Sequence, residues 1–198
     1  MTSAVGKAKV FDGGLLETDE VYIGIDQSLT HYGVTLITKD CARYKTWVYT
    51  SPLRGIDRLQ DIQMFTGENI FEVYDNIADS AMEGYAYSST MAHMAGEIGA
   101  ITKLDLKFWC WDSAAQYPMI VSPSMLKKYI TGKGTGVNKN QILLNVYKKW
   151  GVEFTDDNAA DSYGLARIAS GSSNTAYEKE IVTKLKDPKF REGQYDGH

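Results

Sequence analysis

The stretch VYIGIDQSLTHYGVTLI, residues 21–37, decides the fold. Its first part, residues 21–25, is apolar and rich in β-branched and aromatic residues, which predicts a buried strand that ends at Asp26. A tight connection and Gly33 lead into a second apolar run, residues 34–37, which predicts the antiparallel return of a hairpin. Asp26 is either a solvated carboxylate that opens the turn or a functional group. Because an unpaired buried carboxylate is costly, we expect Asp26 to face a metal ion or a substrate.

The rest of the chain predicts a mixed sheet with helices packed on it. Further strands are expected at 42–50, 78–87 and 119–122, and helices at 56–77, from residue 89 onward, and at 124–130, 138–150, 158–169 and 177–185. Gly67 is expected to bend or split the helical segment that contains it. The predicted fold class is therefore α/β, with a mixed five-stranded sheet flanked by helices. Residues 1–19 predict a flexible N-terminal arm, residues 20–170 one domain, and residues 171–198 a helical or disordered C-terminal tail.

Composition narrows the class of protein. The 198 residues suit a single domain with one core, and 43% of them are apolar. The sequence contains no run of about 18 apolar residues that would span a membrane, and no hydrophobic signal core at its N-terminus. Cys41 and Cys110 are too few and too far apart for a disulfide framework or a zinc site, and they fit reduced thiols. We therefore expect a cytoplasmic protein.

Four acidic residues lie where strands or helices would bring them together. Asp26 ends the first strand, Glu83 lies in the strand at 78–87, and Asp157 and Asp161 are four apart, on one face of a helix start. Singly each signal is weak, because Glu83 could pair with a lysine and Asp157 could be only a helix cap. Clustered carboxylates need cations, and Mg²⁺ or Mn²⁺ prefers oxygen ligands. Two such ions about 3.5–4 Å apart can promote phosphodiester hydrolysis.

Positive charge is concentrated in one segment of an acidic protein. The net charge is −4, yet residues 121–150 contain no Asp or Glu and six lysines: Lys127, Lys128, Lys133, Lys139, Lys148 and Lys149. Lys133 lies in a Gly-rich loop and Lys139 at the following helix start, which favours contact with phosphates. Lys127 and Lys128 are further candidates for binding DNA, whereas a solvated helix face suits Lys148 and Lys149 better.

Three motifs, in order, resemble those of RuvC-type Holliday-junction resolvases. GIDQSLTHYGV (24–34) looks like the first motif, an Asp followed by a Ser/Thr-bearing turn and Gly. AMEGYAY (81–87) is similar to the second, a strand glutamate with a nearby aromatic residue, and DDNAADSYGLARIA (156–169) to the last, an acidic helix. NKNQIL (138–143) also resembles the family's Lys-x-Gln-Val stretch, which strengthens Lys139 as a DNA contact.

The resemblance implies a ribonuclease H-like fold, a homodimer and Mg²⁺-dependent paired nicking of four-way DNA junctions. It implies two Mg²⁺ ions per active site, with Mn²⁺ able to substitute. The implied ligands are Asp26, Glu83, Asp157, Asn158 and Asp161. The Asp-x-Ser-Leu-Thr variant and the extra length are more similar to phage or viral members, which would act in the host cytoplasm. Candidates for the dimer contact are a small-residue helix face (Ala92, Ala95, Gly99) and the aromatic residues Phe108 and Trp111.

Two positions depart from the family's pattern. Asn158 lies three residues before Asp161, where the family usually has Asp or His. Either Asp157 takes over that ligand role, or Asn158 ligates through its carbonyl oxygen. The aromatic residue that the family places three positions after its glutamate, to stack at the junction, is Ala86 here. The remaining candidates for contact with DNA bases are Tyr85 and Tyr87.

Two other functions stay open from the sequence. The opening Asp-x-Ser-x-Thr after a strand also resembles the phosphate loop of sugar-kinase and actin-like ATPases. That class needs a second Asp-x-Gly motif and a Gly-rich adenosine motif, which we do not find in the sequence, and two lobes, for which the chain is too short. The second alternative keeps the fold without catalysis, as a junction-binding protein, and Asn158 is the residue that leaves it open.

Overall fold

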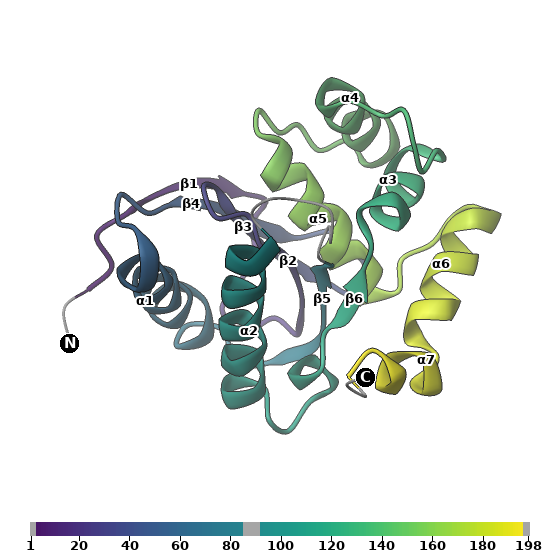
Figure 1. Cartoon of the computed structure of the whole chain (residues 1–198). Coiled ribbons are helices and arrows are strands. Elements are labelled where there is room, and N and C mark those ends of the chain that lie inside the picture. The colour runs from purple at the N-terminus through teal and green to yellow at the C-terminus, as the bar shows by residue number, and fades with distance from the viewer. Residues whose placement is uncertain (1–2, 85–91, 196–198) are drawn as a thin grey trace.

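A mixed β-sheet forms the centre of the computed structural model, which describes residues 3–84 and 92–195 (Figure 1). The described part contains six strands in the order β1-β4-β3-β2-β5-β6. Strand β2 pairs antiparallel with β3 and parallel with β5, and β6 is parallel to β5. The strands are β1 (Lys7–Asp12), β2 (Val21–Asp26), β3 (Tyr32–Thr38), β4 (Tyr44–Thr50), β5 (Ile77–Glu83) and β6 (Met119–Val121).

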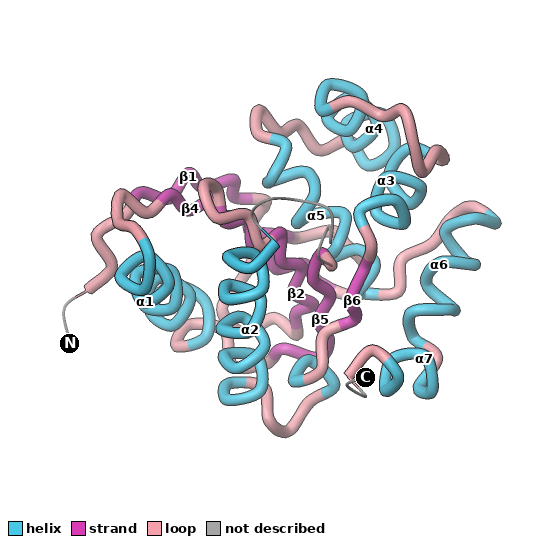
Figure 2. The backbone as a smooth tube through the Cα atoms, viewed as in Figure 1, coloured by secondary structure: helices cyan, strands magenta, loops and turns pink. Residues whose placement is uncertain are grey.

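Helices cover both faces of the sheet (Figure 2). Helices α1 and α2 lie on one face and α5 on the other, with α3 and α4 beyond α5 and with α6 and α7 beside β6. None of the described helices is both long and apolar enough to cross a bilayer. The helices are α1 (Gly55–Thr66), the π-helical turn η1 (Gly67–Phe71), α2 (Ala92–Trp109), the 3₁₀ turn η2 (Ala114–Gln116), α3 (Pro123–Thr131), α4 (Lys139–Trp150), α5 (Asp157–Ser170), α6 (Ala176–Lys186) and α7 (Pro188–Gly193).

Strand β2 is buried on both faces, which explains the unbroken apolar run at residues 21–25. Every residue of β2 is buried. Tyr22 packs in the core on the α5 face, whereas Ile23 and Ile25 pack in the core under α1 and α2. This alternation follows from the two-residue period of a strand. Because Asp26 is two residues beyond Gly24 and four beyond Tyr22, it lies on the α5 face.

Two glycines of the deciding stretch allow α5 to lie directly on β2 and β3. A Cβ atom at Gly24 would lie 2.1 Å from the backbone nitrogen of Ala166 and 2.2 Å from the carbonyl oxygen of Ser162. A Cβ atom at Gly33 would lie 2.6 Å from the carbonyl oxygen of Asn158. The backbone of α5 therefore lies directly against the backbone of β2 at Gly24 and of β3 at Gly33. This close contact brings the acidic start of α5 near the end of β2.

The prediction of five strands is wrong by one, because β1 lies in the segment that was expected to be a flexible arm. Strand β1 pairs antiparallel with β4 from Lys7 opposite Thr50 to Asp12 opposite Lys45. All of its residues are exposed except Phe11, which is half-buried against Phe154 at a ring distance of 5.0 Å. An edge strand with so little burial has no continuous apolar run, so the sequence pattern does not reveal it.

Other predicted elements differ mainly at their ends. The helix expected at 56–77 continues through Gly67 as the turn η1 and stops at Phe71, so Gly67 changes the helix type instead of breaking it. The predicted start of the next helix at residue 89 lies outside the described residues. The C-terminal residues form α6 and α7, and Lys186 and Arg191 from these helices both bond to Asp79 of β5, at 3.1 and 2.8 Å.

Candidate active site

The ends of β2 and β5 bring two carboxylates to the same edge of the sheet. These strands are parallel with Ile25 opposite Met82, so the next residues, Asp26 and Glu83, are neighbours. Asp26 is only 5% exposed. Burial and the negative charges of Glu83 and Asp161 raise the pKa of Asp26 well above its usual value. Burial also raises the pKa of Glu83, while a hydrogen bond with Asp26 and the charge of Lys127 act in the opposite direction.

The start of α5 adds the other two carboxylates. The side chain of Asp156 caps the helix by accepting a hydrogen bond from the backbone nitrogen of Asn158 at 3.0 Å. Asp157 is the first residue of α5, and Asp161 follows one turn later. Burial, with the charges of Glu83 and Asp157, raises the pKa of Asp161 to about 7. Asp26, Glu83, Asp157 and Asp161 thus come from three elements and are near enough for their charges to interact, while their roles as ligands stay a prediction.

The donor set of this cluster fits a hard divalent cation. The atoms that it offers to a cation are carboxylate oxygens, which Mg²⁺ and Mn²⁺ prefer. Burial and neighbouring negative charges raise the pKa of Asp26 and of Asp161, and a bound cation would act against both effects. In the part of the chain that the structure describes, no three Asp, Glu, His or Cys side chains are already grouped to enclose an ion. Carboxylates without a cation repel, so binding an ion requires the oxygen atoms to move together.

The structure distinguishes the two candidates for the fourth ligand. The charge of Asp157 raises the pKa of both Asp26 and Asp161, which puts this carboxylate within the electrostatic reach of the cluster. Its Oδ2 atom pairs with Nζ of Lys139 at 2.6 Å. The Asn158 side chain is bonded to the cap instead, because its Nδ2 donates to Oδ1 of Asp156 at 3.0 Å. The side chain of Asp157 is therefore better placed than that of Asn158 to act on the cluster, and Lys139 lies at the edge of the cluster.

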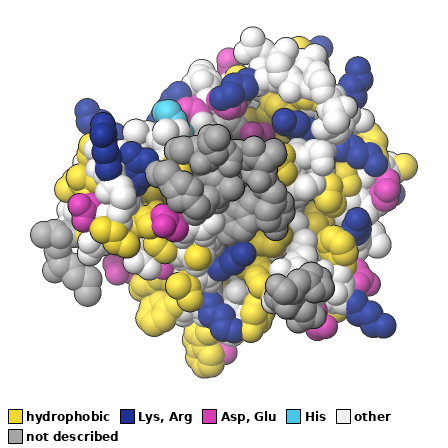
Figure 3. All heavy atoms as spheres, viewed as in Figure 1, with side chains coloured by type: hydrophobic (Ala, Val, Ile, Leu, Met, Phe, Trp, Pro, Cys, Tyr) yellow, Lys and Arg dark blue, Asp and Glu magenta, His cyan; other side chains and the backbone are white. Residues whose placement is uncertain are grey.

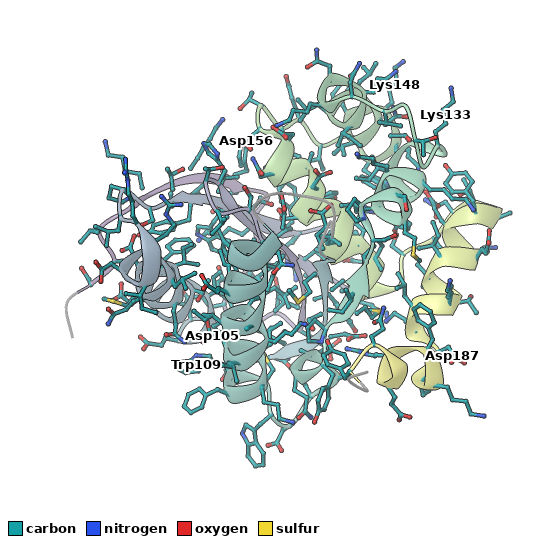
Figure 4. All side chains as sticks on the ribbon, in the orientation of Figure 1. Asp105, Trp109, Lys133, Lys148, Asp156 and Asp187 are labelled. Carbon is teal, nitrogen blue, oxygen red and sulfur yellow. The ribbon has the colours of Figure 1, made fainter. Side chains whose placement is uncertain are left out.

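The other predicted DNA contacts lie at different distances from the cluster. Lys127 of α3 is close enough for its positive charge to act against the rise in the pKa of Glu83 and of Asp161. Lys133 is exposed in the loop between α3 and α4, at the outer end of these helices with Lys148 (Figure 4). Lys128 pairs with Glu180 of α6 at 3.3 Å, so its role in DNA binding stays a prediction. Tyr85 and Tyr87 lie outside the described residues.

Lys149 differs from these lysines because its role is structural. Its ammonium group forms an ion pair with the buried carboxylate of Glu178 and donates to the carbonyl oxygen of Tyr129 at 2.7 Å. Both contacts join α4 to neighbouring helices. The solvated helix face expected for Lys149 is therefore wrong.

Gln27 is a site residue that the sequence reasoning missed. Its Nε2 atom donates to the carbonyl oxygen of Glu83 at 2.6 Å, which ties the residue after Asp26 to the end of β5. Within the described residues, its Oε1 atom is buried without a hydrogen-bond partner. Its position directly after Asp26 is the only sequence signal that could have indicated it. Gln27 positions the two strand ends relative to each other.

We expect the metal-free protein to lose stability as the pH rises from about 4 to about 7. The folded state holds the Asp161 proton up to about pH 7, against a usual pKa of 3.8, so the stabilisation is complete below the lower value and is lost towards the higher one. Asp161→Asn, which never ionises, should therefore melt higher than the wild type at the upper pH in EDTA. Mg²⁺ should raise the melting temperature of the wild type more than that of the variant. If the melting temperatures of the wild type and Asp161→Asn change with pH by the same amount, this expectation is contradicted.

Comparison with known proteins identifies the fold. No protein-family model matches the sequence, and no curated protein matches it. The structure of Thermus thermophilus RuvC in complex with a Holliday junction substrate matches with a TM-score of 0.55 and 20% identity, over 74% of this chain and 90% of RuvC. A second Thermus thermophilus RuvC structure matches with a TM-score of 0.52 and the same identity and coverage. This chain has the fold of RuvC.

The RuvC fold confirms the predicted class, a ribonuclease H-like mixed α/β structure, with six strands in place of five. At 20% identity the likeness extends to the fold alone, so the roles of individual residues depend on the geometry of this chain. The RuvC-like arrangement of sheet and α5 is what places Asp26, Glu83 and Asp161 together. The acidic cluster is therefore a product of the fold and of a few residues at the ends of its elements.

Proposed function

We propose that this protein is a metal-dependent endonuclease that resolves four-way DNA junctions by paired nicks. The observation that carries the proposal is the convergence of Asp26, Glu83 and Asp161, with Lys127 beside them, in a chain with the RuvC fold. The choice of substrate is supported by the matching RuvC structure, which contains a Holliday junction substrate. Carboxylates for a cation and lysines for phosphates are the two groups that phosphodiester hydrolysis of DNA requires.

In this mechanism the chain's own residues orient the ion ligands and the phosphate. Asp26 and Glu83 present oxygen atoms from rigid strands, while Asp161 presents its oxygens from the first turns of α5. Two bound Mg²⁺ or Mn²⁺ ions would supply activation of water and stabilisation of the leaving oxygen. Lys127 is placed to hold the scissile phosphate against the cluster, because its ammonium charge acts on both Glu83 and Asp161. Gln27 keeps the ends of β2 and β5 together.

We infer that Asp157 is the fourth ligand and that Asn158 is not. Asp157→Ala should therefore reduce cleavage more than Asn158→Ala, by about tenfold or more, because a carboxylate offsets the ion's charge better than an amide. The matched readout is Mn²⁺ affinity by calorimetry without DNA, which should fall in the same order. A larger effect of Asn158→Ala in both measurements would move the ligand by one residue.

The test of the proposed function is cleavage of a synthetic four-way junction, with duplex DNA of the same sequence as the control. We expect cleavage of the junction in Mg²⁺, none in EDTA and little cleavage of the duplex. Binding without cleavage in Mg²⁺ and in Mn²⁺ would favour the non-catalytic junction-binding protein. Hydrolysis of ATP without an effect on DNA would favour the actin-like ATPase.

We propose that the active form is a homodimer, because two symmetric nicks need two acidic clusters. Large apolar side chains of and next to α2 are unusually exposed: Leu104 is 65%, Phe108 72% and Trp111 69% accessible. Leu104 and Phe108 are four residues apart, so they share one face of α2. Patches of this kind mark interaction surfaces. The alternative contact, the small-residue face with Ala92 and Ala95, involves side chains outside the described set.

We expect light scattering at micromolar concentration to give twice the mass of the chain. Phe108→Glu with Leu104→Glu should give the mass of one chain, because charges in a shared apolar contact are costly to bury. The exposed residue Tyr147 of α4 offers a matched control, since Tyr147→Glu should leave the dimer intact. A wild-type protein that stays monomeric and still makes paired nicks would contradict the symmetric mechanism.

A further inference from the structure

Strand β1 places a lysine in line with the acidic cluster. The strand pairings put Asp26 opposite Gly33, Gly33 opposite Val48, and Val48 opposite Lys9. Residues directly opposite each other share a face of the sheet, so Lys9 lies on the same α5 face as Asp26. Three strand spacings of about 4.8 Å separate the two residues, which is roughly 14 Å. Lys7 lies two residues further along β1, on the same face and towards the loop that follows Asp26.

The contacts of β1 fix this arrangement. Phe11 packs edge-on against Phe154, which shows that this side of β1 faces the segment leading into α5. Nζ of Lys9 donates to the hydroxyl oxygen of Thr155 at 2.6 Å and lies 5.1 Å from the centre of the Phe11 ring. Thr155 precedes the cap residue of α5 by one position. The ammonium group is thus held beside the helix that presents Asp157 and Asp161, although Lys9 remains exposed.

Positive charge therefore flanks the acidic cluster on two sides. Lys7 and Lys9 lie on the β1 side, and Lys127 and Lys139 lie on the α3–α4 side. Figure 3 shows Lys and Arg side chains over the β1–β4 side of the same rim as well as over α3 and α4. Along the axis of duplex DNA, the phosphates of one strand rise by about 3.4 Å per nucleotide. A span of roughly 14 Å therefore lies within one helical turn, about 34 Å, of a phosphate that is cut at the acidic cluster.

We propose that Lys7 and Lys9 of β1 form a second phosphate-binding surface, which holds the backbone of a junction arm within about one helical turn of the cut. This inference rests on the proposed function, because it takes the acidic cluster as the place of cleavage. The competing explanation is that these lysines only protect an exposed edge strand from pairing with other chains. That explanation does not require the bond from Lys9 to Thr155, and it predicts no change in DNA affinity when the charges are removed.

The experiment measures binding of the full-length protein to a labelled four-way junction and to duplex DNA, without divalent metal, over a range of salt concentrations. Lys7→Gln with Lys9→Gln should weaken binding on the order of tenfold at low salt and reduce the salt slope by about 2. Lys7→Arg with Lys9→Arg should restore both values because it keeps the charges. Lys179→Gln with Lys189→Gln, which removes two exposed lysines of α6 and α7, is the matched control and should leave the slope unchanged.

The outcomes separate this inference from the proposed function. Unchanged affinity and slope in the Lys7 and Lys9 double variant, with normal binding by the wild type, would overturn the second phosphate-binding surface alone. An equal loss in the Lys179 and Lys189 control would also overturn it, because the effect would then be one of net charge. A wild-type protein that binds neither junction nor duplex would overturn both proposals. Thermal unfolding of each variant checks that β1 remains paired, and Lys9→Gln alone provides a milder change if the double variant unfolds.

Discussion

Asp26→Asn is expected to abolish junction cleavage, by at least about a thousandfold, and to leave junction binding intact. Asp26 is the buried carboxylate on which the charges of Glu83, Asp161 and Asp157 act together. An amide at this position removes a charged ligand, and losing the ion's contribution to the transition state costs several kcal/mol. The lysines proposed to contact phosphate are unchanged, so affinity should stay within a few-fold of the wild type or increase slightly.

The matched control for this change is Asp57→Asn, which makes the same substitution at an exposed position of α1. Cleavage is measured as single-turnover product formation in Mg²⁺, and binding as a gel shift in EDTA. Asp57→Asn should cut and bind like the wild type. If Asp26→Asn cuts the junction at the wild-type rate, the acidic cluster is not the place of catalysis.

Gly24→Ala is expected to destabilise the fold by about 3 kcal/mol or more. The new methyl group would lie 2.1 Å from the backbone nitrogen of Ala166 and 2.2 Å from the carbonyl oxygen of Ser162. Both neighbours are backbone atoms of α5, so the clash is relieved only if the whole helix moves off β2. Such a shift also displaces Asp161 from Asp26, so residual folded protein should cut poorly.

Thermal or denaturant unfolding measures the effect of Gly24→Ala. Gly96→Ala in α2 is the matched control, because a Cβ atom there meets no atom of the described residues within 4 Å, and alanine favours the helix. We expect Gly96→Ala to be neutral or slightly stabilising. A Gly24→Ala protein as stable as the wild type would show that α5 does not contact the sheet as closely as described.

The parts of the fold that the sequence predicted are those with a strong local pattern. The apolar run before Asp26 is unbroken because β2 is buried on both faces, so β2 was predicted at its observed place. The carboxylates were predicted to lie close together because each of them stands at the end of a strand or at the start of a helix, and short connections leave few arrangements of these ends in a mixed sheet. Strand β1 has no such signal, since its stability comes from pairing with β4 and from the Phe11–Phe154 contact.

Contacts between distant segments could not be predicted in the same way. The pairing of Lys139 with Asp157, and of Lys128 with Glu180, depends on how α3 and α4 pack against α5 and α6. Lysines of the same basic segment therefore have different surroundings. The bond between Lys9 and Thr155 joins residues that are 146 positions apart, so no local pattern indicates it. A charge count along the sequence finds the basic segment but not its partners.

Mapping the cuts on a synthetic four-way junction tests the proposed function most directly. The junction is labelled on each of its four strands in turn, incubated with the protein in Mg²⁺, and analysed for product lengths. We predict cuts at symmetry-related positions on two opposed strands, which yield two nicked duplexes, and no cuts with Asp26→Asn. Intact strands in both Mg²⁺ and Mn²⁺, under conditions in which the protein binds the junction, would contradict the assignment of this protein as a junction-resolving nuclease.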